Sequence, residues 1–197
     1  MNVIEHYNKL IDENNDPVYD PEPLKKYMDQ WDGQVFIDAM KLDKTKTVLE
    51  VGVGTGRLAL KTAPLCKEFV GVDISPKTIE RAIYNLSQFK NAKLICDDFM
   101  TCEFKTKFDV IYSSLTFMHI RDKEKCIHKI YSLLHPGGCF VLSVDKSQNK
   151  YLEYENRKIE LFPVHPADTK RYMINSGFIV SECIETEFAY IFVGAKA

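Results

Sequence analysis

The sequence predicts an α/β fold: a doubly wound, mostly parallel seven-stranded sheet with a C-terminal antiparallel hairpin, arranged as a three-layer α-β-α sandwich. Short apolar runs alternate with helical patterns from Thr47 onward, which is typical of parallel strands joined by right-handed helical crossovers. A glycine-rich turn separates the first apolar run from the first helical pattern. Only a few polar residues separate the last two apolar runs, which favours a hairpin at the sheet edge.

The strands are predicted from apolar runs that are too short for helices and are bounded by polar residues, glycine or proline. The parallel strands are expected at residues 47–51, 69–72, 93–96, 109–112 and 139–144. The hairpin is expected over residues 177–184 and 188–194.

Helices are predicted between these runs, at residues 57–65, 76–89 and 122–134. The middle helix carries an apolar stripe with helical spacing, formed by Ile79, Ala82, Ile83 and Leu86. Ser75 and Pro76 supply a cap and a first-turn proline at its start. Residues 134–138, which read L-H-P-G-G, are expected to end the third helix and turn into the next strand.

The first 46 residues are expected to form a helical cover, or lid, over the carboxyl edge of the sheet, and residues 47–197 one compact unit. A helix is predicted over 3–11, and a second helical stripe is formed by Leu24, Tyr27, Met28, Trp31 and Val35. Ten acidic and six basic residues give the cover a charge of −4, and the rest of the chain carries +2, for a total of −2. Positions 10–24 contain no Lys or Arg.

Composition excludes several classes of protein. Hydrophobic residues make up 45% of the chain and charged residues 27%, as in globular proteins. A net charge of −2 argues against binding by neutralisation of many phosphates, so no DNA partner is expected. No stretch approaches the ~18 consecutive apolar residues of a membrane span. No secretion signal is recognised, so the protein is expected to be cytoplasmic, with its six cysteines as reduced thiols. None of these cysteines has C-x-x-C spacing, so no metal site is expected.

The segment most informative about function is residues 48–58, V-L-E-V-G-V-G-T-G-R-L, which reads as strand, glycine turn and helix start. Such a turn lets a ligand approach the backbone closely, and ligands of open sheets bind at the carboxyl ends of strands. Asp73 ends the next strand, 21 residues after Gly52, where an acid can accept both hydroxyls of a ribose. Arg57 occupies the third-glycine position of a nicotinamide fingerprint, and no P-loop string is present.

At these residues the chain resembles the class I S-adenosylmethionine-dependent methyltransferases. Four further segments follow in the order typical of that family, at residues 69–75, 96–99, 108–114 and 133–140. The resemblance implies an enzyme, a methyltransferase, with S-adenosylmethionine as its cofactor. The absence of a P-loop lysine agrees with a cofactor that has no phosphates.

The resemblance also implies which residues bind the cofactor: Glu50, Gly52, Gly54, Gly56, Asp73, Ile74, Asp97, Asp98, Phe99 and Ser113. Asp73 is expected at the ribose and Ile74 on the adenine. Asp98, with the Phe99 N–H nearby, is expected at the adenine amino group, and Asp97 is the alternative. Ser113 ends the strand beneath the sulfonium. Glu50 either supplies a carboxylate near that cation or caps the turn as a structural acid.

Methyl transfer from a sulfonium depends mainly on alignment of donor and acceptor, so the sequence is less informative about the acceptor. His119 and His165 are candidates for a base that would act on a protonated acceptor. Aromatic residues proposed to line an acceptor pocket are Tyr7, Tyr19, Trp31 and Tyr154, with Tyr151 and Phe162 as further candidates. Each of these residues has a plain structural role as its alternative.

The expected acceptor is a small molecule, methylated on a nitrogen, oxygen or sulfur atom. The chain has no N/D-P-P-Y/F tetrapeptide and no Pro-Cys pair, and its acidic cover would repel phosphate backbones. The acidic loop at 12–22 fits either a cationic acceptor such as an amine or a solvated loop. Alternative functions are methylation of protein or RNA, and non-catalytic binding of S-adenosylmethionine. A monomer or homodimer is expected.

Overall fold

The computed structural model describes residues 1–197 and contains a sheet of seven strands in the order β3-β2-β1-β4-β5-β9-β8. The parallel strands are β1 (Thr47–Val51), β2 (Glu68–Asp73), β3 (Ala92–Cys96), β4 (Phe108–Ser113) and β5 (Leu134–Asp145). β8 (Ile179–Glu185) and β9 (Ala189–Ala195) form an antiparallel hairpin, and β9 pairs antiparallel with β5. The predicted doubly wound sheet is confirmed. Its strand order reverses at β1, which lies between β2 and β4.

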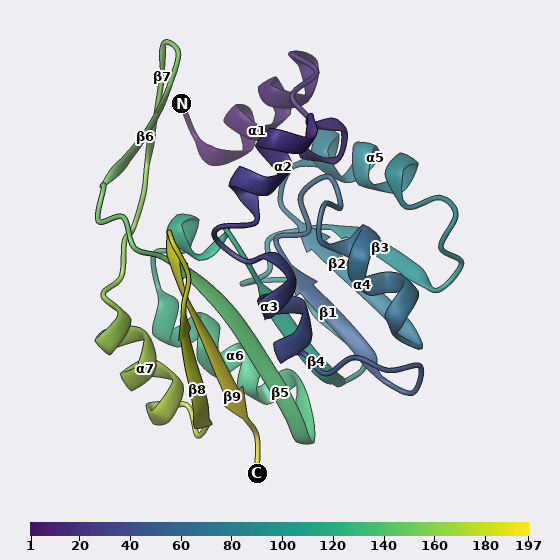
Figure 1. Cartoon of the computed structure of the whole chain (residues 1–197), viewed down its shortest axis with the longest axis vertical. Coiled ribbons are helices and arrows are strands. Elements are labelled where there is room, and N and C mark those ends of the chain that lie inside the picture. Colours follow the sequence, from purple (N-terminus) through teal and green to yellow (C-terminus); the bar gives the residue numbers. More distant parts are fainter.

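Helices cover both faces of this sheet (Figure 1). One face packs against α3 (Gly33–Ala39), α4 (Ala59–Thr62) and α5 (Pro76–Asn85), and the other against α6 (Lys123–Leu133) and α7 (Pro166–Asn175). Successive strand residues point to opposite faces, so Val48 belongs to one buried cluster and Leu49 to the other. The predicted α-β-α sandwich is confirmed.

Two predicted helices are shorter than the sequence indicated. The one expected over 57–65 divides into α4 and a 3-10 turn, η2 (Ala63–Leu65), because Pro64 has no N–H with which to continue the α-helix. α5 starts as predicted, with the side chain of Ser75 accepting the N–H of Thr78, but it ends at Asn85. The chain then turns, and Leu86 and Phe89 pack against the buried cluster beneath β1.

β5 begins at Leu134, whereas the sequence predicted a turn at 134–138 and a strand only from 139. The turn residues form a bulge within the strand. Phe108 of β4 opposes Leu134, whereas Val110, two residues on, opposes Cys139. Residues 135–138 therefore bulge out of the ladder with β4. The N–H of Gly137 donates to the carbonyl of Lys196 at 2.9 Å, and the N–H of Lys196 donates to the carbonyl of Gly138 at 2.8 Å. These two hydrogen bonds hold the bulge beside the end of β9.

The N-terminal cover contains α1 (Val3–Asp12), η1 (Pro17–Tyr19) and α2 (Glu22–Met28), followed by α3. The single helical stripe predicted through residues 24–35 is wrong, because the chain breaks between α2 and α3. Asp32 caps α3, and Gly33, the first residue of α3, has a φ of +60°, which is not a right-handed helical conformation. Leu24, Tyr27 and Val35 consequently remain exposed.

Ion pairs attach the front of the cover to the rest of the molecule. Asp12 pairs with Lys77 at 2.5 Å, Asp16 with Arg81 at 3.2 Å, and Glu13 with Arg157 at 2.6 Å. His6 is the one buried residue of α1. Three of the five carboxylates of the acidic loop, those of Asp12, Glu13 and Asp16, thus have basic partners within the chain.

A second, two-stranded antiparallel sheet, β6 (Tyr151–Tyr154) with β7 (Arg157–Glu160), was not predicted. Its strands alternate between exposed and more buried residues but are short and highly charged. In Figure 1 this hairpin projects beside α1, and the Glu13–Arg157 ion pair joins the two. Across the whole structure, helices of the length and hydrophobicity needed to cross a membrane are absent.

Candidate functional site

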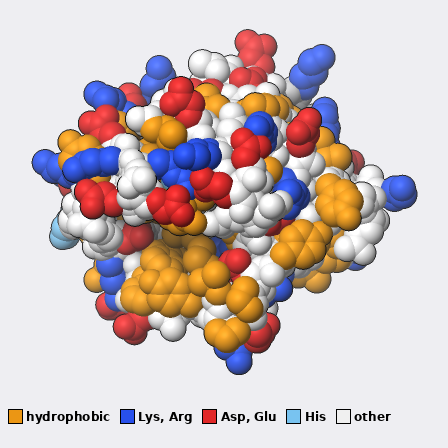
Figure 2. All heavy atoms as spheres, turned by 90° about the horizontal axis from the view of Figure 1, so that it is seen from above, with side chains coloured by type: hydrophobic (Ala, Val, Ile, Leu, Met, Phe, Trp, Pro, Cys, Tyr) orange, Lys and Arg blue, Asp and Glu red, His pale blue; other side chains and the backbone are white.

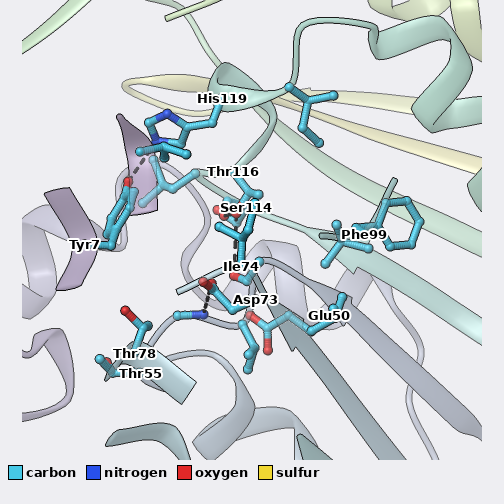
Figure 3. Close-up of a pocket in the computed structure, with 18 of the residues that line it drawn as sticks. Tyr7, Glu50, Thr55, Asp73, Ile74, Thr78, Phe99, Ser114, Thr116 and His119 are labelled. Carbon is cyan, nitrogen blue, oxygen red and sulfur yellow. Dashed lines mark hydrogen bonds between the residues drawn. The ribbon is translucent and has the colours of Figure 1, made fainter. Parts of the chain in front are cut away.

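A cavity of about 560 Å³ lies at the carboxyl ends of β1, β2 and β4, beneath α1 (Figure 3). Its floor is the glycine turn after β1, and one wall is the start of the loop after β2. Opposite lies the loop after β4 with its 3-10 turn, η3 (Phe117–His119). The position agrees with the switch point at β1, where adjacent crossovers leave on opposite faces and open a crevice.

The glycine turn brings backbone to the cavity surface. Gly52 has a φ of +79°, and a Cβ there would lie 2.0 Å from Oγ1 of Thr116, so only glycine fits between the two loops. Gly54 has a φ of +56°, and no atom lies within 4 Å of the place where its Cβ would be. Gly54 therefore presents bare backbone to open space in the cavity. Gly56 packs against Leu86 and does not line the cavity.

Asp73 joins the end of β2 to the glycine turn. Its carboxylate accepts the N–H of Gly54 at 3.0 Å, drawn in Figure 3, and the N–H of Ser75 at 3.0 Å. Burial raises the pKa of Asp73 above its usual value, although these N–H bonds act in the opposite direction. Ile74 and Thr78 line the cavity beside it. An acid held in this way can accept further hydroxyl hydrogen bonds from a ligand.

Glu50 lies deeper, within β1, and is 3% exposed. It accepts a hydrogen bond from the hydroxyl of Tyr112 at 2.8 Å. Burial raises the pKa of Glu50 to about 8, and the hydroxyl bond and the nearby Arg57 only partly oppose this. Because it also lines the cavity, Glu50 can bind a cation there as a carboxylate.

Asp97, Asp98 and Phe99 follow β3 and line another part of the cavity. Asp97 Oδ1 accepts the N–H of Asp98 at 2.8 Å, and Asp98 Oδ1 accepts the N–H of Met100 at 2.8 Å. Each carboxylate therefore has one oxygen in a local turn and one oxygen left over. Phe99 is buried at 6% exposure.

Ser114, which the sequence analysis did not select, lines the cavity, and Ser113 does not. The hydroxyl of Ser113 donates to the carbonyl of Val51 at 2.7 Å and is fully buried. Neighbouring side chains at a strand end point in opposite directions, so the Ser113 hydroxyl is turned into the protein whereas Ser114 faces the cavity. The hydroxyl of Ser114 donates to Asp32 at 2.7 Å.

Tyr7 and His119 meet at the side of the cavity closed by α1. The Tyr7 hydroxyl lies 2.8 Å from Nε2 of His119, and the rings are nearly perpendicular at 88°. Burial lowers the pKa of His119 to about 4 and raises the pKa of Tyr7 above its usual value. Both side chains are therefore neutral near pH 7, and their hydrogen bond joins the cover to η3.

Six other predicted residues do not line the cavity, and two of them are the further candidates Tyr151 and Phe162. His165 is exposed and caps α7 by accepting the N–H of Ala167. Tyr19 is 62% exposed. The indole of Trp31 donates to Asp145 at 2.8 Å and packs on Phe188, whereas Tyr154 lies against the Arg157 guanidinium.

Apart from Tyr7, the residues of the apolar wall of the cavity were not predicted from the sequence. One face of α1 lines it, formed by Val3, Tyr7, Leu10 and Ile11. Leu115 and Ile120 contribute from the loop after β4. The helical spacing of the α1 residues was a usable signal, but it does not distinguish a face packed on protein from one turned to a ligand.

Comparisons with known proteins agree with this geometry. A family model described as a methyltransferase domain matches residues 42–184. The chain is 34% identical over 113 residues to malonyl-[acyl-carrier protein] O-methyltransferase 1 of Ilyobacter polytropus, a match that covers 56% of this chain and 41% of that protein. The chain thus spans less than half the length of this curated relative.

Two solved structures are similar over nearly the whole chain. Magnesium protoporphyrin IX methyltransferase from Synechocystis PCC 6803, with bound S-adenosylmethionine, has a TM-score of 0.79 at 16% identity, covering 99% of this chain and 95% of that one. N-methyltransferase NodS from Bradyrhizobium japonicum, in complex with S-adenosylhomocysteine, has a TM-score of 0.71 at 14% identity, covering 98% and 97%. The chain therefore belongs to the methyltransferase-domain family and has the class I Rossmann-like fold of these structures.

Proposed function

We propose that this chain transfers the methyl group of S-adenosylmethionine to a nitrogen, oxygen or sulfur atom of a small molecule. One observation carries the proposal: a single cavity contains both the residues suited to the cofactor and, under α1, a neutral polar pair beside an apolar wall. A cofactor at the first set of residues would share its cavity with an acceptor at the second. Holding the donor and the acceptor close together and aligned provides most of the rate acceleration that methyl transfer needs.

The residues present fit S-adenosylmethionine part by part. The Asp73 carboxylate suits the ribose hydroxyls, with Ile74 beside the adenine and Asp98 or Asp97 at its amino group. The open backbone at Gly54 and the carboxyl of Glu50 suit the amino-acid part, whose ammonium and sulfonium charges favour a carboxylate nearby. When bound, the cofactor supplies an electrophilic methyl group.

Tyr7 and His119 are the polar residues proposed to orient the acceptor. His119 stays neutral well below pH 7, so the pair offers hydrogen bonds rather than a charge to the incoming group. With a pKa of about 4, His119 is a weak base. We therefore assign it to holding the nucleophilic atom in line rather than to removing a proton.

A small acceptor is favoured over a macromolecule by the cover and the surface above it. α1 lies across the cavity and turns Leu10 and Ile11 into it, which leaves an apolar wall of a size suited to a small molecule. Figure 2, seen from above, shows acidic and basic side chains interspersed on this face rather than gathered into one basic field. A long phosphate backbone would find little complementary charge there.

Calorimetry with S-adenosylhomocysteine, followed by a search for an acceptor, tests the proposed function. Binding in the micromolar range is expected. Turnover of labelled S-adenosylmethionine with a panel of amines, phenols, thiols and carboxylic acids should then place the label in small-molecule fractions. Label in precipitated protein or RNA would instead support a macromolecular acceptor. Binding without turnover on any acceptor would support a non-catalytic role, and silence in the titration would overturn the proposal.

The affinity for S-adenosylmethionine is expected to rise with pH between about 6 and 8. Glu50 holds a proton below its raised pKa of about 8, and a bound cation favours its carboxylate form, so binding should release a proton. The raised pKa of Glu50 also makes the free energy of unfolding of the free protein depend on pH. The contribution of Glu50 to stability is fully present below the ordinary pKa of glutamate and is lost as the pH rises through about 8. Titrations at pH 7 in phosphate and in Tris buffer measure the released proton, and Glu50→Gln should abolish it.

Tyr7→Phe is expected to lower turnover by roughly tenfold to a hundredfold, because it removes the hydroxyl that bonds His119. Affinity for S-adenosylhomocysteine should change by less than about threefold, since the cofactor residues stay in place. Tyr19→Phe is the matched control, because Tyr19 belongs to the same cover but does not line the cavity. Equal turnover of the two variants would exclude Tyr7 from the acceptor site.

A further inference from the structure

We propose that Asp32, a residue of the N-terminal cover, is a positioning residue that holds the loop after β4 in the shape that binds the cofactor. The inference rests on the proposed function for the identity of the ligand. Asp32 does not itself line the cavity. It acts through Ser114 and Arg57, which do.

Asp32 lies in the break between α2 and α3 and is fully buried. Its carboxylate accepts the N–H of Gly33 at 2.7 Å and the hydroxyl of Ser114 at 2.7 Å. It also forms a two-pronged pair with Arg57, with nitrogen–oxygen distances of 3.1 and 2.5 Å. A buried carboxylate with this many donors is strongly held in place.

The two cavity residues that Asp32 contacts come from different sides of the site. Arg57 follows the glycine turn and leads into α4, whereas Ser114 follows β4. Asp29, also from the cover, lies 3.8 Å from Arg57. The cover therefore ties the glycine turn to the β4 loop, although the two loops are far apart in sequence.

Leu115, the residue after Ser114, explains why this loop needs to be held. Its φ is +55°, a left-handed conformation that is unfavourable for a leucine. Such strained residues persist only where the surroundings over-determine them, and they cluster at ligand sites. Leu115 also lines the cavity.

The contacts on either side of Leu115 are those that would enforce its conformation. Before it, the Ser114 hydroxyl is anchored on Asp32. After it, the Thr116 hydroxyl donates to the carbonyl of Ser114 at 3.1 Å, and its side chain fills the space next to Gly52. The anchor at Ser114 comes from the cover, so loss of Asp32 would release one end of the strained residue.

The test combines substitutions of the anchor and of the strained residue. Ser114→Ala and Asp32→Asn are expected to weaken S-adenosylhomocysteine binding by about tenfold to a hundredfold, the scale of a hydrogen bond to a charged group. Asp38→Asn is the matched control, because Asp38 is an exposed acid within α3, the helix that Asp32 caps. Its affinity should be unchanged.

Leu115→Gly separates positioning from a general loss of stability, since glycine adopts a positive φ without strain. In a Leu115→Gly background, Ser114→Ala should weaken binding by less than about threefold, because the anchor no longer has strain to oppose. Amide hydrogen exchange of residues 113–117 in the free protein should be faster in Ser114→Ala than in the unsubstituted chain.

The possible failures are distinguishable. No binding of S-adenosylhomocysteine by the unsubstituted protein would overturn the proposed function, and the exchange measurement would still test the loop. Equal loop exchange with and without the Ser114 hydroxyl would overturn the positioning role. So would a Ser114→Ala effect of the same size in both Leu115 backgrounds. If Asp32→Asn does not fold, Ser114→Ala still decides the question, because it leaves the Asp32–Arg57 pair intact.

Discussion

Gly54→Val is expected to abolish binding of S-adenosylhomocysteine while the protein stays folded. No protein atom lies within 4 Å of the place where a Cβ would stand on Gly54, so the new side chain meets no clash in the free protein. It would project into the cavity and occupy the space in which a ligand reaches the glycine turn. Calorimetry measures the loss, and circular dichroism reports the fold.

The φ of +56° at Gly54 strains a valine regardless of the cavity, so this substitution needs a control for strain. Gly137→Val provides one. Gly137 also has a positive φ, of +79°, with no atom within 4 Å of its Cβ position, but it lies in the β5 bulge away from the cavity. The two variants should lose similar stability, and only Gly54→Val should lose binding. Retained affinity in Gly54→Val would show that the turn does not touch the ligand.

Asp73→Ala is expected to weaken binding of S-adenosylhomocysteine by at least about 1.5–3 kcal/mol, the scale of charge-assisted hydrogen bonds. The carboxylate accepts the N–H groups of Gly54 and Ser75, and its loss removes both the proposed ribose acceptor and the tie between β2 and the glycine turn. Calorimetry gives the affinity, and a denaturant titration gives the free energy of unfolding.

Asp109→Ala is the control for the stability that Asp73→Ala loses with its backbone hydrogen bonds. The Asp109 carboxylate also accepts a backbone N–H, that of Thr47 at 2.7 Å, together with the Thr47 hydroxyl at 2.8 Å. Asp109 does not line the cavity. Both aspartate variants should lose stability, but affinity should fall only for Asp73→Ala. An unchanged affinity in Asp73→Ala would move the ribose site elsewhere.

The sheet and the glycine turn could be predicted because their signals are local. Apolar runs such as residues 47–51 are short and bounded, and the alternation with helices restricts the strands to a parallel arrangement. The position of Asp73 relative to Gly52 follows from the length of one strand-helix-strand unit. The differences between prediction and structure lie at the ends of helices. The helix predicted over 76–89 stops at Asn85, and the turn that follows brings Leu86 and Phe89 to the core.

The acceptor side could not be predicted to the same degree. Tyr7 and His119 are 112 residues apart, and only the fold brings them to 2.8 Å. Tyr19 and Trp31 have the same aromatic character in the sequence but have partners outside the cavity. Tyr154 does not line the cavity either, although the Asn15 side chain that donates to its hydroxyl does. Residue type indicates what a side chain can do, whereas the neighbours that compete for it depend on packing.

The sequence by itself determined the fold class and the place of the glycine turn, because short apolar runs, their alternation with helical patterns and glycine spacing are signals along the chain. Only the tertiary structure decided that Ser114 rather than Ser113 faces the cavity, that His165 lies outside it, and that Asp32 of the cover contacts both Ser114 and Arg57. The physical reason is that side-chain direction at a strand end and contacts between distant segments depend on how the layers pack. Neither leaves a periodic signal along the chain.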